Sequence, residues 1–258
     1  ILYVYYIQFF KNFIIKLYDN YNTSMCGIFA LINKTNFNQN DEQLLLNEFM
    51  KIKHRGPDNT NYIINNSNIF MGFHRLSIND LSESGDQPFV SKLQCATDNL
   101  QDISSEPNNI TLICNGEIYN YKELVDTYNL ELKSNSDCEV ILHLYLKLGF
   151  IETIKLLDGV FACVLHDKKN DIIYAARDPF GIRSLYIGEN ANGTYGFCSE
   201  LKGICLLLNN IKQFNSGCTW NSRDRHFKSY KIALVEYAES MNTNAANALL
   251  KTLEEPPE

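Results

Sequence analysis

A cysteine directly follows a methionine at Met25-Cys26, near the start of a chain of 258 residues. If processing makes Cys26 the first residue, that residue carries both a thiol and a free α-amine. The thiolate is the nucleophilic form of cysteine, and an α-amino group, which titrates near pH ~8, can accept the thiol proton. The pair therefore predicts a nucleophile and its base in one residue, as in enzymes with an N-terminal threonine. The alternative is a small buried apolar side chain.

Four further segments carry charged and amide side chains in a distinctive order. They are HRGPD at 54–58, HRLSI at 74–78, NGEIYN at 115–120 and SDCE at 136–139. Behind the start at Met25 they resemble the class II glutamine amidotransferase domain of asparagine synthetases, over about residues 25–230. Segments 157–162, 176–182 and 199–202 agree with this resemblance. The segment 115–120 is more similar to the asparagine synthetase branch than to the glucosamine-phosphate or phosphoribosylamine branches.

The resemblance implies that Cys26 attacks the side-chain amide of glutamine and forms a glutamyl thioester. The α-amine of Cys26 would act first as the base and then as the acid that protonates ammonia. The resemblance assigns the oxyanion donors to the Asn115 side chain and the Gly116 backbone N–H. The residues support this role, because a buried strand that ends in Asn-Gly offers a side-chain donor beside an unhindered amide. The alternative is an ordinary Asn-Gly turn.

Free glutamine carries an α-carboxylate and an α-ammonium group, so its site needs charges of both signs. Arg75 suits the carboxylate, because a guanidinium can grip it with two hydrogen bonds. Asp137 suits the ammonium group, and Glu117 is a possible second partner for it. Each of these charges is otherwise typical of a solvated surface.

Other residues in the motifs are expected to be structural. His54, Arg55 and Asp58 are predicted to position a loop near the site, and His54 and His74 to be structural histidines with satisfied nitrogens. The sequence 177–179, Arg-Asp-Pro, is predicted to fix a turn through an internal ion pair.

Apolar periodicity predicts mixed α and β structure. Strands are expected at 26–32, 69–76 and 110–114, and a hairpin at 160–167 and 172–177. Helices are expected at 41–53, 121–128 and 138–148, and a long surface loop at 91–109. The resemblance implies an α+β fold, the αββα sandwich of N-terminal nucleophile hydrolases, in which two antiparallel sheets lie between helical layers.

Three regions are predicted: an upstream extension or propeptide at 1–25, the amidotransferase domain at 26–230, and a foreign tail at 231–258. The apolar part of the first region, residues 1–17, is too short and too interrupted by polar residues for a good membrane span. The tail resembles a fragment of a bacterial DNA-polymerase clamp-loader ATPase, with a strand at 231–236 and a helix at 242–254. The alternative is an amphipathic cap on the domain. The sequence contains no Walker A phosphate loop.

Composition narrows the function further. The net charge is −7 and no long basic run occurs, which argues against nucleic-acid binding. The eight cysteines are scattered without metal-ligand spacing, which argues against a zinc site and a disulfide framework. Free cysteines suit a reducing compartment, and a cytoplasmic location is expected.

The predicted reaction is hydrolysis of L-glutamine to glutamate and ammonia. In the family, the ammonia passes to an ATP-using domain that makes asparagine through a β-aspartyl adenylate. That domain contains an SGGxDS loop, and this sequence has no such string. We therefore expect a truncated asparagine synthetase without a cofactor, since ATP and Mg²⁺ would belong to the missing synthetase domain. The alternatives are a stand-alone subunit that feeds a separate synthase, or a non-catalytic gene-junction fragment.

Overall fold

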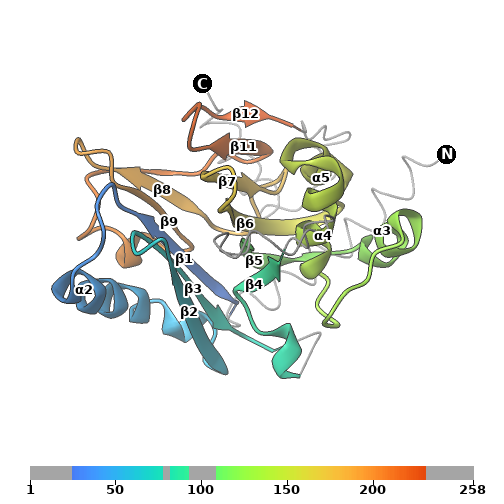
Figure 1. The fold of residues 1–258 in the computed structure, drawn as a ribbon, viewed down its shortest axis with the longest axis horizontal. Helices are drawn as coiled ribbons and strands as arrows, with labels where there is room; N and C mark the ends of the chain where they lie inside the picture. Colours follow the sequence, from blue (N-terminus) through green and yellow to red (C-terminus); the bar gives the residue numbers. More distant parts are fainter. Residues whose placement is uncertain (1–24, 78–81, 93–108, 231–258) are drawn as a thin grey trace, which may run out of the picture.

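Two six-stranded antiparallel sheets form the centre of the protein (Figure 1). The computed structural model describes residues 25–77, 82–92 and 109–230. In spatial order, sheet A consists of β10 (Asn210–Gln213), β8 (Tyr186–Glu189), β9 (Tyr195–Cys198), β1 (Gly27–Ile32), β3 (Ile69–Arg75) and β2 (Asn59–Asn65). Sheet B consists of β12 (Lys228–Ser229), β11 (Cys218–Asn221), β7 (Ile172–Arg177), β6 (Gly159–Asp167), β5 (Asn109–Ile118) and β4 (Phe89–Lys92).

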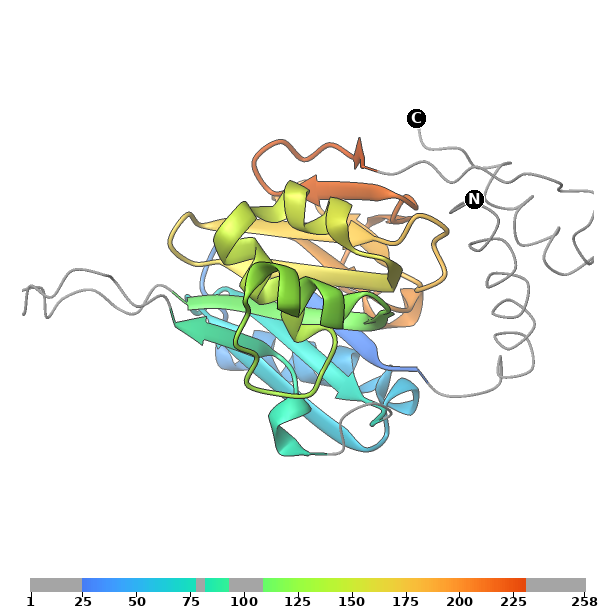
Figure 2. The same ribbon diagram turned by 90° about the vertical axis from the view of Figure 1, so that its right-hand side faces the viewer.

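Helices cover the outer face of each sheet. α2 (Gln39–Met50) packs on sheet A through Leu45 and Phe49, which lie in one apolar cluster with Phe29 and Phe70 of the sheet. α3 (Tyr121–Tyr128), α4 (Glu139–Leu148) and α5 (Phe150–Leu156) cover sheet B (Figure 2). Short 3₁₀ turns are η1 (Lys53–Arg55), η2 (Glu83–Gly85) and η3 (Leu201–Gly203). The predicted αββα sandwich is confirmed.

The core between the two sheets fixes their relative position. Ile28 and Phe197 of sheet A lie in one apolar cluster with Ile113 and Trp220 of sheet B. The rings of Phe197 and Trp220 meet edge to face, with their centroids 5.3 Å apart. Full burial of one such large apolar side chain contributes roughly 1.5–3 kcal/mol, so this cluster holds β1 against β5.

Most predicted elements are confirmed, and the differences have local causes. α2 begins two residues before the predicted start, because Asn38 and Asp41 form a reciprocal capping box at its N-terminus. The predicted hairpin forms β6 and β7, and Asp167 pairs with Ile172. Part of the predicted loop at 91–109 is strand, since β4 continues to Lys92, while residues 93–108 lie outside the described part. The tail 231–258, with its predicted strand and helix, also lies outside it.

The predicted end of the strand at 110–114 is wrong. β5 continues to Ile118, so Asn115 and Gly116 lie within the strand rather than in a turn. Gly116 faces Phe161 of β6, and a Cβ at Gly116 would come within 2.6 Å of the Phe161 Cβ. The close approach of the two strands therefore requires glycine at this position.

One edge of β5 has no neighbouring strand beyond Leu112, which pairs with Phe89, the first residue of β4. Gln87 takes the place of that strand at Cys114: its Nε2 donates to the Cys114 carbonyl at 3.0 Å, and its Oε1 accepts from the Cys114 N–H at 2.6 Å. Gln87 itself is buried. A buried backbone group without a partner is costly, so this side chain stabilises the part of β5 that leads to Asn115.

The substitution Gln87→Ala should lower the free energy of unfolding by about 2–4 kcal/mol, because it leaves two buried backbone groups without partners. Urea denaturation followed by circular dichroism measures this difference. The matched control is Gln43→Ala on the exposed face of α2, which should change stability by less than about 0.5 kcal/mol. Equal stability of the two variants would contradict the structural role of Gln87.

Candidate functional site

Cys26 lies at the start of β1, one of the central strands of sheet A. Arg55 fixes its backbone, since the Arg55 Nε donates to the Cys26 carbonyl at 3.1 Å. Two residues later, the Ile28 N–H donates to the Ser199 hydroxyl at 3.0 Å, and the Ser199 N–H donates to the Ile28 carbonyl at 3.0 Å. The backbone position of Cys26 is therefore tied to two neighbouring segments.

The thiol of Cys26 is half-buried and contacts the backbone of Leu76. The Leu76 N–H donates to Sγ at 3.3 Å, and Sγ lies 3.5 Å from the Leu76 carbonyl. Burial raises the pKa of the Cys26 thiol, the Leu76 hydrogen bond lowers it, the Cys138 thiol raises it further, and the cations Arg183 and Arg55 lower it. The net direction is upward, so this thiol needs a base in order to react at neutral pH.

Asn115 shares the inter-sheet face of β5 with Ile113, because side chains alternate along a strand. Cys26 packs against the apolar cluster that contains Ile113. The Asn115 side chain is buried, and its Nδ2 atom has no hydrogen-bond partner. An unsatisfied buried donor costs about 1–3 kcal/mol. The Asn115 Nδ2 atom is therefore a buried donor available to a further acceptor.

The Gly116 N–H is directed to the open edge of β5. The Phe161 carbonyl, opposite Gly116, accepts from the Asp178 N–H at 2.8 Å and so faces away from β5. In an antiparallel ladder, Gly116 must then direct its own N–H and C=O away from β6. The Gly116 carbonyl lies 3.6 Å from the Cys138 Sγ on this edge.

Asp137 lies at the same edge of β5, two residues beyond Gly116 along the strand. Its Oδ2 accepts from the Ile118 N–H at 2.5 Å, and its side chain is buried. Glu117 projects from the inter-sheet face of β5 and is exposed. Even so, partial loss of water raises the pKa of the Glu117 carboxyl, the Asp137 charge raises it further, and Arg183 lowers it. The two acidic residues therefore lie close together at the end of β5, as their assignment to one ammonium group requires.

Glu139 holds the loop that presents Asp137. Its carboxylate accepts from the backbone N–H groups of Lys133 and Ser134, from the Ser134 hydroxyl, and contacts the His143 ring at 3.1 Å. Burial alone would raise the pKa of Glu139, but these hydrogen bonds lower it to about 2. Glu139 is thus ionised near neutral pH and fixes residues 133–139.

Arg75 ends β3 and directly precedes Leu76, the residue that contacts the thiol. Its Nη1 donates to the Ser82 carbonyl at 2.7 Å and pairs with Asp86 at 2.5 Å. Neither Asp86 nor Gln87 is predicted from the sequence. The only signal for them is the Gly-Asp-Gln-Pro string at 85–88. The ion pair orients the Arg75 side chain within the loop that follows β3.

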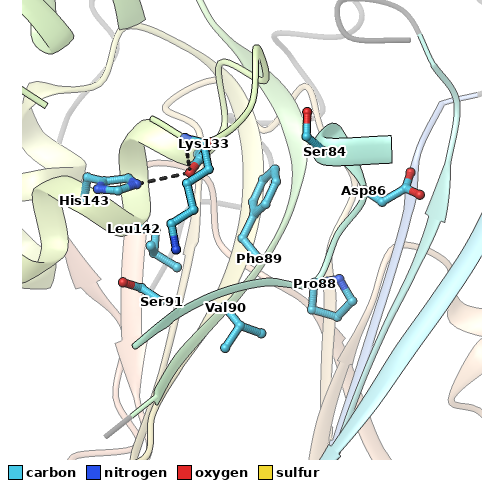
Figure 3. Close-up of a pocket in the computed structure, with 10 residues that line it drawn as sticks. Ser84, Asp86, Pro88, Phe89, Val90, Ser91, Lys133, Leu142 and His143 are labelled. Atoms are coloured by element: carbon cyan, nitrogen blue, oxygen red, sulfur yellow. Dashed lines mark hydrogen bonds and ion pairs between the residues drawn. The ribbon is translucent and has the colours of Figure 1, made fainter. Parts of the chain in front are cut away.

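A small cavity of about 200 Å³ lies between residues 84–91 and the segment that contains Lys133 and α4 (Figure 3). Its walls include Phe89, Lys133 and His143, whereas neither Cys26 nor Asn115 lines it. The Asp86 carboxylate points away from Lys133 and His143 in this view. The cavity is therefore distinct from the cysteine site.

The residues predicted to be structural behave as expected. Glu200 pairs with His54 at 3.0 Å and with Arg55 at 3.1 Å. Asp58 accepts from the Ser77 N–H at 2.8 Å and so holds the start of the loop after Leu76. His74 is fully buried, and both of its ring nitrogens have partners. Its Nδ1 lies 2.8 Å from the Thr60 hydroxyl, and its Nε2 lies 3.0 Å from the Phe49 carbonyl.

The turn after β7 differs in detail from the predicted ion pair. Buried Asp178 accepts backbone N–H groups from Phe180, Ile182 and Arg183, each at 3.0 Å. Arg177 instead donates to backbone carbonyls, among them those of Arg183 and Phe214, each at 2.7 Å. Backbone hydrogen bonds thus shape the turn, while the Arg177 charge lowers the pKa of Asp178 against the larger effect of burial.

The described residues contain no cluster of His, Cys, Asp or Glu suited to hold a metal ion. Within the same described ranges, no helix is long and apolar enough to cross a membrane.

An antiparallel αββα sandwich with a cysteine at the head of a central strand defines the class of N-terminal nucleophile hydrolases. The family described as "Glutamine amidotransferase domain" matches residues 25–218. The chain belongs to this glutamine amidotransferase family.

Curated relatives agree with this assignment. The chain is 41% identical over 193 residues to a probable glutamine-hydrolyzing asparagine synthetase of Acanthamoeba polyphaga mimivirus, covering 73% of this chain and 32% of that protein. It is 36% identical over 209 residues to the glutamine-hydrolyzing asparagine synthetase of Triphysaria versicolor, covering 80% and 32%. The chain thus spans about a third of the length of these relatives.

A solved structure shares the fold at low sequence identity. The glutamine phosphoribosylpyrophosphate amidotransferase from B. subtilis aligns with a TM-score of 0.64 and 16% identity, covering 81% of this chain and 50% of that one. A second family, "DNA polymerase III, delta subunit", matches residues 205–258. This agrees with the resemblance of the tail. In the structure, residues 210–213 and 218–221 belong to the two sheets of the sandwich as β10 and β11.

The substitution Glu139→Gln should lower the free energy of unfolding at pH 7 by about 2–3 kcal/mol. A carboxyl group whose pKa is lowered on folding adds stability above its ordinary pKa, here 4.5, and loses that contribution as pH falls toward about 2. The difference between wild type and variant should therefore be constant above pH 6 and narrow below pH 4.5. Urea denaturation across this range measures it.

The matched control is Glu152→Gln, whose carboxylate is exposed in an ion pair with Lys155 on α5. It should have little effect at any pH, because exposed ion pairs contribute little. A Glu139→Gln effect that does not depend on pH would show that the ionised carboxylate is not the stabilising group.

Proposed function

We propose that this domain hydrolyses L-glutamine to glutamate and ammonia, with Cys26 as the nucleophile. The observation that carries the proposal is the Asn115 Nδ2 atom, a buried donor without a partner that faces the core against which Cys26 packs. Hydrolysis of an amide passes through a negatively charged oxyanion. A preorganised donor that has no other partner suits the stabilisation of this oxyanion.

The raised pKa of the Cys26 thiol makes a base necessary. We propose that the active form begins at Cys26, so that its α-amine takes the thiol proton. While Met25 is attached, this nitrogen is a peptide amide and has no basicity. The thiolate then attacks the amide carbon of glutamine, and the Asn115 Nδ2 and the Gly116 N–H stabilise the oxyanion. Collapse breaks the C–N bond, the α-ammonium returns its proton to the leaving ammonia, and water hydrolyses the thioester to glutamate.

Charged residues on either side of the thiol are proposed to hold the α-groups of glutamine. Arg75 is assigned to the α-carboxylate, in an orientation set by Asp86. Asp137 and Glu117 are assigned to the α-ammonium group. Burial raises the pKa of Glu117 and the Asp137 charge raises it further, and a cation between the two carboxylates would relieve this second effect.

We further propose that the ammonia serves asparagine formation, because the curated relatives are named asparagine synthetases. The adenylation of aspartate would need ATP and Mg²⁺ bound by another domain or chain. The residues assigned here to glutamine hydrolysis need neither.

The substitution Cys26→Ala should abolish ammonia release from glutamine without unfolding the domain, and Cys26→Ser should be severely impaired because a hydroxyl is far harder to deprotonate. A chloroketone analogue of glutamine should add its mass at Cys26, as read by peptide mass spectrometry. Iodoacetamide should also label exposed Cys205. The control Cys205→Ala should keep full activity. Analogue labelling at Cys114 or Cys138, with activity retained in Cys26→Ala, would show that another thiol reacts.

Steady-state kinetics should separate binding from chemistry. Asn115→Ala should lower kcat by about 100- to 1000-fold, since it removes an oxyanion donor. Arg75→Ala and Asp137→Ala should mainly raise KM, because they remove contacts made equally in the ground state and the transition state. Asn47→Ala on the exposed face of α2 is the control and should leave both constants unchanged. Wild-type kcat in Asn115→Ala would refute the assignment.

A further inference from the structure

Arg183 places a positive charge beside the residue that precedes Cys26. Its Nη1 atom contacts the Met25 Sδ, and its Nε atom is buried without a hydrogen-bond partner. The backbone on which it sits is rigid, since the Arg183 N–H donates to buried Asp178 at 3.0 Å and the Arg183 carbonyl accepts from Arg177 at 2.7 Å. The backbone of Arg183 is therefore fixed, and its guanidinium lies beside Met25, which precedes β1.

The charge of Arg183 is not neutralised by a neighbouring carboxylate. No salt bridge joins it to an acidic residue in residues 25–77, 82–92 and 109–230. Arg55, the other cation near Cys26, pairs with Glu200 at 3.1 Å. A paired cation has a weaker field at a distance than an unpaired one, and the Arg183 charge lowers the pKa of the Cys26 thiol more than the Arg55 charge does.

Several titratable groups share this region. They are Glu117 near the end of β5, Tyr119 directly after it, Asp137 and Cys138 before α4, and Arg55 with Glu200 on the side of sheet A. The pKa values of Cys26, Glu117, Tyr119 and Cys138 are all raised above their usual values, and in each case the Arg183 charge is one of the effects that oppose this rise. Its field therefore reaches the nucleophile as well as the residues across the site.

We propose that Arg183 is a positioning residue for proton transfer, whose unpaired charge keeps the α-amine of Cys26 in its neutral, basic form near neutral pH. This inference rests on the proposed function, in which Cys26 is the first residue. Removal of Met25 takes away the Sδ atom that contacts the Arg183 Nη1. The α-amine that forms on Cys26 takes the place of the peptide nitrogen, a few covalent bonds from that Sδ atom. A like charge at this range disfavours protonation of the amine, so more of it can accept the thiol proton.

The test is the pH profile of kcat/KM for glutamine hydrolysis by the chain whose first residue is Cys26. Arg183→Met should move the acid limb upward by about one pH unit, because the α-amine regains a pKa nearer its ordinary value. Activity at pH 6.5 should fall roughly tenfold, while the plateau at high pH should change little. Arg183→Lys keeps the charge and should keep the wild-type limb.

The matched control is Arg223→Met, which removes an exposed arginine from the turn after β11. It should leave the profile unchanged. An unshifted limb in Arg183→Met would overturn the inference, and so would an equal shift in Arg183→Lys, since charge would then not be the cause. Loss of the high-pH plateau in folded Arg183→Met would also overturn it.

The pH dependence of Cys26 alkylation by iodoacetamide gives a second measurement that needs no turnover. The same upward shift is expected in Arg183→Met. If the wild-type chain releases no ammonia but the alkylation profile shifts, the proposed function fails and the effect of Arg183 stands. If the wild type is active and neither profile shifts, the proposed function stands and the inference fails.

Discussion

The open edge of β5 is the feature on which the site depends. β4 begins at Phe89 opposite Leu112, and the backbone of β5 beyond Leu112 must find partners other than a strand. Gln87 supplies both partners of Cys114, and Asp137 accepts from the Ile118 N–H. Between these two filled positions lies Gly116, whose N–H is directed to the same edge. Side chains thus close the edge on either side of the one amide that is proposed to receive the oxyanion.

The second constraint is the proton on Cys26. Burial makes the thiol a weak acid, and two cations only partly offset this effect. His74, the histidine next to this strand, is buried with both nitrogens engaged, and its pKa is lowered by burial. It is therefore poorly placed to act as a base. A base that forms part of the nucleophile itself solves this problem without another buried titratable group, provided that the α-amine is free and neutral.

The sequence predicted the fold and the place of Cys26 at the head of a buried strand, because these depend on local motifs in a fixed order. It failed where long-range packing decides. Asn115-Gly116 is typical of a turn, yet the close approach of Phe161 keeps both residues in β5. Gln87 and Arg183 could not be predicted, because Gln87 acts on Cys114 and Arg183 on Met25, each far away in sequence. No local pattern marks such pairs. The short strands β8 to β12 were also missed, since four or fewer residues carry little periodicity.

Orientation of the charged residues was likewise set by tertiary partners. The motif order placed Arg75 and Asp137 in the site, but the sequence did not indicate Asp86, which pairs with Arg75 across the loop. Nor did it indicate that Glu139 would fix the segment in front of Asp137 through three hydrogen bonds to Lys133 and Ser134. In both cases the motif contains the group proposed to meet the substrate, and a neighbouring carboxylate holds that group or its loop in place.

The most direct measurement compares ammonia release from glutamine by two forms of the chain, one that begins at Cys26 and one that retains residues 1–25. A positioned general base contributes roughly 100- to 10,000-fold to the rate. The form that begins at Cys26 should therefore be at least about 100-fold faster, with intact mass confirming each N-terminus. Equal rates for the two forms would contradict a mechanism in which the α-amine of Cys26 takes the thiol proton.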